Sequence, residues 1–125
     1  MTVSGNLSLS VGFVAAGANL SSNQFFGVKL DAAGDAVLCD TLGEACLGVL
    51  TNDPTLGCAA GITIGGAQKS VAGAAVAAGA FVTVNAAGKF ITAASGHAIN
   101  GVAQSASGAD GELITVVLKY MGVAP

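Results

Sequence analysis

The stretch Val28-Lys29-Leu30-Asp31-Ala32-Ala33-Gly34 returns later in the chain as Val82-Thr83-Val84-Asn85-Ala86-Ala87-Gly88. A second block follows in the same order: Gly43-Glu44-Ala45-Cys46-Leu47-Gly48-Val49 returns as Gly96-His97-Ala98-Ile99-Asn100-Gly101-Val102. The separations between the blocks match closely in the two copies. The sequence therefore predicts an internal duplication, and this duplication determines the architecture.

Each copy has the pattern of β-strands joined by tight turns. Val28-Lys29-Leu30 alternates apolar and polar residues, which is the period of a half-buried strand. The segment Asp31–Gly34 has the residues of a hairpin loop, because Asp can bond to the backbone ahead of it and Gly tolerates a positive φ. Residues 36–39 are then the returning strand. Each copy closes on a β-branched run, Ile62-Thr63-Ile64 in the first and Ile114-Thr115-Val116 in the second.

The remaining segments are short strands and turns. We predict strands at residues 47–50, 101–103 and 113–120, and turns at 52–57 and 105–111. Gly65-Gly66-Ala67-Gln68-Lys69-Ser70 superficially resembles a phosphate-binding loop, but Gln68 stands where that loop needs Gly, so we predict a β-turn leading into a strand. Alanine favours helix in the linker 69–81, yet its glycines interrupt any helical window, and we predict a strand, a turn and the start of the next strand.

Short strands separated by glycine-rich turns predict an all-β fold, a small β-barrel or sandwich built from two similar repeated halves around a common core. The predicted domain covers residues 20–125, with the repeat at about 26–64 and 80–118. Residues 1–19 form an N-terminal arm or an edge strand. We expect Met1–Ser10 to add a strand to a neighbouring molecule.

The composition indicates a folded protein with few charges. Of the 125 residues, 53% are hydrophobic and 9% are charged, which is the opposite of a disordered chain. Nucleic acid is excluded as a direct ligand, because there is no Arg and four Lys cannot neutralise a phosphate backbone. No apolar stretch has the length of a membrane span, and no basic N-terminal segment indicates secretion. A weakly charged surface favours association, so we expect a subunit that acts in contact with a partner.

The sequence shows no catalytic, cofactor-binding or metal site. The three cysteines, Cys39, Cys46 and Cys58, match no metal-ligand spacing and are expected to be reduced thiols. His97 replaces Glu44 of the first copy in a turn and is expected to be an exposed loop residue. Most carboxylates lie in or beside turns. Asp31, Asp35 and Asp40 are a candidate cation site, but their spacing lacks the Gly and the terminal Glu of a calcium loop. We therefore expect a protein that is not an enzyme.

The repeated pattern resembles the small head decoration proteins of tailed bacteriophages, also called capsid cement proteins. The resemblance covers about residues 20–118. It departs from the usual pattern in the low charge, the three cysteines and the apolar N-terminus. Its strongest parts in the second copy are residues 69–73 and 76–84, Gly88, residues 101–103 and residues 111–118.

The resemblance implies a virion protein on the outer capsid surface, made in the host cytoplasm, with the major capsid protein as its partner. It also implies a homo-oligomer, with a trimer favoured and a dimer possible. The alternative is a non-catalytic β-barrel binding module, for instance for surface glycans. Such a module would expose aromatic side chains for stacking, and the chain has five Phe, one Tyr and no Trp, mostly at strand positions.

Overall fold

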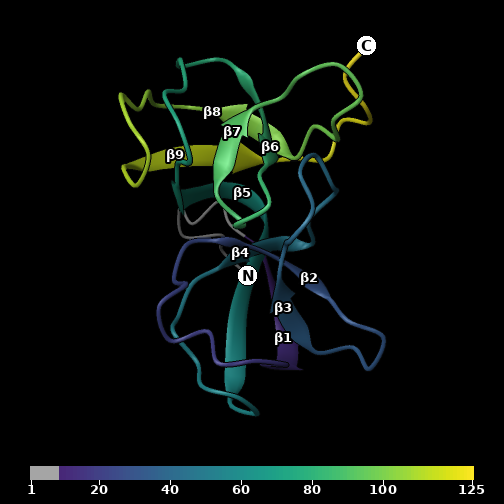
Figure 1. Cartoon of the computed structure of the whole chain (residues 1–125). Helices are drawn as coiled ribbons and strands as arrows, with labels where there is room; N and C mark the ends of the chain where they lie inside the picture. Colours follow the sequence, from purple (N-terminus) through teal and green to yellow (C-terminus); the bar gives the residue numbers. More distant parts are fainter. Residues whose placement is uncertain (1–8) are drawn as a thin grey trace, which may run out of the picture.

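The computed structural model describes residues 9–125, and these form β-strands joined by turns and loops (Figure 1). The predicted all-β class is confirmed. Among these residues there is no helix with the length and apolar character that a membrane span requires. The strands are β1 (Leu9–Ala15), β2 (Gly27–Leu30), β3 (Ala36–Leu38), β4 (Gly48–Leu50), β5 (Ala59–Val71), β6 (Phe81–Val84), β7 (Phe90–Thr92), β8 (Gly101–Ala103) and β9 (Leu113–Leu118).

The long strand β5 joins two lobes. The part of β5 at residues 59–65 pairs with β1 and, at residues 62 and 63, also with β4, whereas residues 66–71 pair with β9. Figure 1 shows the lobes one above the other, with β5 running from the lower lobe into the upper one. We refer to residues 9–64 as lobe 1 and to residues 65–125 as lobe 2.

The turn predicted at Gly65–Ser70 is wrong, because these residues lie inside β5. The glycines do have a conformational role there. Gly66 has a positive φ of 83°, which Gly adopts without the steric cost of a Cβ, and it lies where the strand changes partners. The glycine pair therefore bends a continuous strand instead of ending it.

The two lobes have the same strand order, as the duplication predicts. Lobe 1 has the order β3-β2-β4-β5-β1 and lobe 2 the order β7-β6-β8-β9-β5, all antiparallel. The second half of β5 is therefore the counterpart of β1. In each lobe the sheet curls until its ends meet at one parallel bridge, Ala16 with Ala36 and Ala72 with Phe90. Each lobe is thus a small barrel-like unit.

The hairpin turns confirm the expected use of Asp and Asn. The Asp31 carboxylate accepts hydrogen bonds from the Ala33 and Asp35 N–H groups, each at 2.9 Å. The Asn85 side-chain oxygen accepts the same pair of bonds, from Ala87 at 2.9 Å and Lys89 at 3.0 Å. An acceptor oxygen at this position fixes both turns, so the two residue types are interchangeable there.

The apolar side chains form two clusters rather than the common core that the sequence predicts. One cluster fills lobe 1 around Leu20, Val28 and Ile62, and the other fills lobe 2 around Val82 and Phe90. The physical reason is that each sheet curls on itself and covers its own inner face. The lobe 2 cluster also includes Cys39 and Val49 from lobe 1, so the lobes are packed together.

Replacing Gly101 with alanine should destabilise the protein by about 2 kcal/mol or more. A methyl group at Gly101 would overlap the Val117 carbonyl oxygen, a backbone atom of the neighbouring strand that cannot rotate away. Gly48 meets the Thr63 carbonyl oxygen in the same way in lobe 1. Urea unfolding measures the loss. In the control G108A the nearest atoms lie 3.7 Å from the new Cβ, and a change within about 0.5 kcal/mol is expected.

Candidate interaction surface

The contact between the lobes shows which surfaces of this fold can pack together. Gly27 of lobe 1 is buried against the end of lobe 2, and its N–H donates to the Gly88 carbonyl oxygen at 2.7 Å. A Cβ on Gly27 would lie 2.8 Å from Val84 Cγ1 and 3.5 Å from Phe90 Cζ. Only glycine therefore allows this close approach.

The neighbouring strand positions of lobe 1 are buried in the same contact. Gly27 pairs with Val49, and Val49 pairs with Thr63, so the three residues form a row across β2, β4 and β5. Val49 is fully buried and Thr63 is 2% exposed. Val49 belongs to the apolar cluster of lobe 2, so this row of lobe 1 closes the end of the lobe 2 barrel.

Backbone and amide bonds hold the same junction at its edge. The Gly43 N–H donates to the Val84 carbonyl oxygen at 2.8 Å, and the Ala98 N–H donates to the Gly43 carbonyl oxygen at 2.9 Å. The buried Asn100 side chain accepts from the Cys46 N–H at 3.1 Å and donates to the Glu44 carbonyl oxygen at 3.0 Å. The polar groups at the junction are thus paired across it, as buried polar groups require.

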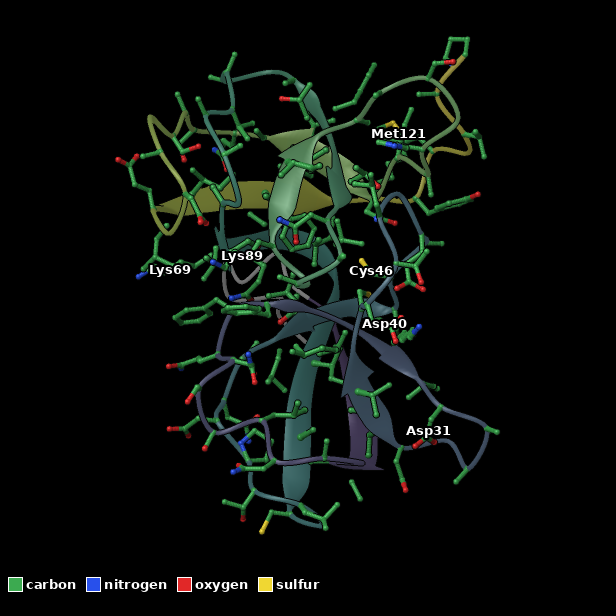
Figure 2. All side chains as sticks on the ribbon, viewed as in Figure 1. Asp31, Asp40, Cys46, Lys69, Lys89 and Met121 are labelled. Carbon is green, nitrogen blue, oxygen red and sulfur yellow. The ribbon has the colours of Figure 1, made fainter. Side chains whose placement is uncertain are left out.

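Two lysines of lobe 2 lie over aromatic rings of lobe 1 at this junction. Lys69 Nζ is 5.9 Å from the centre of the Phe25 ring, and Lys89 Nζ is 5.9 Å from the centre of the Phe26 ring. Figure 2 shows Lys69 and Lys89 at the left of the view and Cys46 and Asp40 at the right, all near the height of the junction. The Phe25 carbonyl oxygen also accepts a hydrogen bond from the Val71 N–H at 3.0 Å.

Lobe 2 has the counterpart of the buried row, but there it faces outward. Phe81 pairs with Val102, Val102 pairs with Val117, and Val117 pairs with Ala67. Phe81 is 51% exposed and Val117 is 39% exposed. An apolar row across four strands on the outer face of a small protein indicates a contact surface. This surface could not be predicted from the sequence, because whether a row is covered depends on the neighbouring lobe.

The C-terminal tail, residues 119–125, runs along the edge of lobe 2. The expected final strand at 113–120 ends at Leu118, and the chain then bonds to residues 96–100. The Ile99 N–H donates to the Gly122 carbonyl oxygen at 2.8 Å, and the Gly96 N–H donates to the Ala124 carbonyl oxygen at 2.9 Å. The tail leaves Tyr120 and Val123 exposed, and Figure 2 shows Met121 in the upper lobe, toward the C-terminal end.

An ion-pair cluster lies on the outside of lobe 1. Lys29 Nζ is 2.7 Å from Asp40 Oδ1 and 3.1 Å from Glu44 Oε1. The hydrogen bonds to Asp40 and Glu44 raise the pKa of Lys29 to about 12. The same Lys29 bond lowers the pKa of Asp40 below its ordinary value of 3.8. Asp40 is 71% exposed, so this is a solvated cluster of modest energy.

Two of the three aspartates considered as a cation site have other partners. Asp31 holds its hairpin turn and Asp40 bonds to Lys29, and Figure 2 shows these two residues apart. Across residues 9–125, no group of three or more His, Cys, Asp and Glu side chains is arranged to hold a metal ion.

His97 is half-buried rather than exposed as expected. Its Nδ1 accepts a hydrogen bond from the Ala94 N–H at 3.1 Å, and its ring packs against Gly43 across the junction. Glu44 has the same task in lobe 1, where its carboxylate accepts from the Asp40 and Thr41 N–H groups at 2.7 and 2.9 Å. His97 therefore stabilises a turn.

The three cysteines occupy different environments, and all are free thiols. Cys39 is buried, Cys46 is half-buried and Cys58 is exposed, with the Cys58 sulfur 3.2 Å from Thr55 Oγ1. The hydrogen bond with Cys46, together with burial, raises the pKa of the Cys39 thiol. Cys39 is thus a protonated core residue at neutral pH.

An open hollow of about 290 Å³ lies on lobe 1 at its free end. Val14, Ala15, Gly57 and Ala59 line it, and these small residues offer no charged or aromatic group to a ligand. The described part of its lining therefore gives the hollow a shape but no chemical group for a ligand.

Taken together, the fold and its surfaces define a duplicated all-β protein whose outer face carries an apolar contact row. The structure is similar to the crystal structure of the N base of head fiber gp8.5 from bacteriophage phi29, with a TM-score of 0.67 and 17% sequence identity. The match covers 90% of this chain and 95% of that one. The likeness to a phage head protein is thus confirmed at the level of the fold. A scan of family models and a search of curated proteins find no match for the sequence.

Replacing Asp40 with asparagine should lower stability at pH 7 and have no effect in acid. Because the pKa of Asp40 is lowered in the folded protein, its contribution is present above pH 3.8 and is lost as the pH falls through the folded value. Urea unfolding at pH 7 and near pH 2.5 should show the two proteins converging in acid. The control is D53N, an exposed turn residue outside the ion pairs of the described chain; an equal loss there would contradict the prediction.

Thiol labelling should distinguish the cysteines in the order of their exposure. Cys58 should react first with iodoacetamide at pH 8, Cys46 more slowly, and Cys39 only after unfolding, since its raised pKa and burial keep it protonated and covered. Mass spectrometry of peptides at successive times measures the three rates. Fast labelling of Cys39 in the native protein would show that this part of lobe 1 is not packed into lobe 2.

Proposed function

We propose that this protein is a phage capsid decoration protein that binds the outer surface of the head and stabilises the shell. Its partner is the major capsid protein, and it acts as a homo-oligomer, with a trimer favoured and a dimer possible. It is made in the host cytoplasm and ends in the virion. Catalysis, nucleic-acid binding and membrane association form no part of this role.

The observation that carries the proposal is the similarity of the whole two-lobe fold to the N base of a phage head fiber. The match spans both lobes rather than one repeat unit, because it covers 90% of this chain. A fold can serve many functions, so the surface must support the assignment as well.

The surface supports a role in protein contact. The outer row of Phe81 and Val117 and the tail residue Tyr120 are apolar and exposed, whereas most buried polar groups are already paired within the chain. The net charge of −3, without any Arg, suits a place away from packaged DNA. Many copies on one lattice allow modest contacts at each site to add up to a large stabilisation of the shell.

A glycan-binding role has less support from the structure. Phe81 and Tyr120 are exposed aromatic residues, but the hollow on lobe 1 is lined by Val14, Ala15, Gly57 and Ala59. Sugar binding by stacking needs aromatic rings beside polar groups in one depression. Capsid binding therefore remains the better proposal.

Binding to heads should be saturable and should make them more stable. The purified protein is mixed with DNA-filled heads that lack it, from the phage that encodes it, and then pelleted. We expect it to pellet with the heads at a fixed ratio to the major capsid protein, and to raise the temperature at which the heads release DNA.

Two controls accompany this experiment. Heat-unfolded protein should remain in the supernatant, and a panel of surface glycans should give no binding. Failure to pellet with the heads at any soluble concentration would refute the decoration role, and glycan binding without head binding would favour the alternative.

A further inference from the structure

The two lobes meet head to tail, through unlike faces. Lobe 1 contributes the row of Gly27, Val49 and Thr63, which we call the row face. Lobe 2 contributes the end of its barrel, where Val84 and Phe90 lie, which we call the end face. Each lobe has both a row face and an end face, and the contact between the lobes uses the row face of lobe 1 and the end face of lobe 2. The chain therefore retains an unused row face on lobe 2 and an unused end face on lobe 1.

The unused row face lies on lobe 2. Its residues are Phe81, Val102 and Val117, which hold the same strand positions as Gly27, Val49 and Thr63. Thr63 is 2% exposed, whereas its counterpart Val117 is 39% exposed. This row is therefore more apolar than the one already in use, yet it faces outward.

The unused end face lies on lobe 1. Leu30 pairs with Ala36 as Val84 pairs with Phe90, so Leu30 and Val84 are equivalent. Lobe 1 covers Val84 completely, but Leu30 is 44% exposed. Ala15, which lines the open hollow, is the counterpart of Val71 in lobe 2. The Val71 N–H donates to the Phe25 carbonyl oxygen in the contact between the lobes.

The unused faces differ from the used ones in the size of their residues. Within the chain, a glycine in the row approaches a phenylalanine in the end face, with the Gly27 Cβ position 3.5 Å from Phe90 Cζ. In the unused pair the row has Phe81, and the counterpart of Phe90 is Ala36, which lobe 1 itself buries completely. The exposed residue of the unused end face is therefore Leu30, so a contact between the unused faces buries the apolar side chains of Phe81 and Leu30.

The C-terminal tail replaces only one part of the used contact. In lobe 1 the Gly43 N–H donates to the Val84 carbonyl oxygen of lobe 2. In lobe 2 the equivalent Gly96 N–H donates instead to the Ala124 carbonyl oxygen of the tail. The tail thus completes the hydrogen bonds of the edge. The row of Phe81 and Val117 beside that edge stays exposed.

We propose that the unused row face of one copy packs on the unused end face of a second copy, in a head-to-tail contact like the one that joins the two lobes except at the edge that the C-terminal tail already occupies. Phe81 packs against Leu30 of the neighbour. A contact between unlike faces closes into a ring when the rotation allows it, and the proposed product is a small ring. This inference rests on the homo-oligomer part of the proposed function and does not depend on binding to the capsid.

Single substitutions on either face should prevent self-association. F81S and L30S remove one exposed apolar residue each, and each should weaken self-association by about tenfold or more. Light scattering and sedimentation over a concentration series measure the change. The control is L42S, because Leu42 is 53% exposed and lies on neither unused face. Urea unfolding verifies that all variants fold, since the changed side chains are exposed.

Mixing the two variants tests the head-to-tail geometry directly. F81S keeps an intact end face and L30S keeps an intact row face, so a mixture should form heterodimers and nothing larger. Each variant alone should be monomeric under the same conditions. A symmetric interface would not produce this pattern.

Three results would overturn the inference. They are a wild-type protein that is monomeric at its highest soluble concentration, an oligomer that persists in both F81S and L30S, and a loss of association in L42S equal to theirs. Head binding by a monomeric wild type would overturn this inference and the homo-oligomer part of the proposed function but not the decoration role, whereas a ring that does not bind heads would overturn only the decoration role.

Discussion

The close approach of Gly27 to Val84 and Phe90 is the contact on which the arrangement of the two lobes depends. It brings the row of lobe 1 onto the open end of lobe 2, so that Val49 enters the lobe 2 cluster and excludes water from it. Burial of apolar surface is non-directional and does not set the orientation of one lobe relative to the other. The hydrogen bonds at Gly88 and Asn100 set this orientation. The contact therefore converts two small barrels into one packed body.

A barrel of this size has difficulty in covering its own core. Small domains bury a lower fraction of their surface than large ones, and five short strands leave an end open. Duplication solves this problem for one lobe, because the first copy covers the end of the second. The duplication leaves the end of the first copy uncovered, and Leu30 is exposed there. The asymmetry between a covered and an uncovered copy is thus a consequence of building a protein from two head-to-tail units.

The low charge of the chain is consistent with this way of holding the structure together. Its ion pairs, Lys29 with Asp40 and Glu44 and Lys89 with Asp110, lie at or near the surface of the described chain. Such pairs contribute little to stability. Backbone ladders, side-chain oxygens in turns and apolar packing carry the fold instead. A surface with so few charges also gives little protection against association, which is consistent with the contact role proposed for the protein.

The sequence by itself determined the parts of the structure that depend on local chemistry. The repeated strands, the Asp31 and Asn85 turns and the all-β class could be predicted, because alternation and turn residues act within a few positions. Only the tertiary structure decided that Gly65–Ser70 continues a strand, that the core divides in two, and which row is covered. Thr63 and Val117 hold the same place in their repeats, yet one is buried and the other exposed. Their difference comes from a neighbour distant in sequence, and no local pattern records such a neighbour.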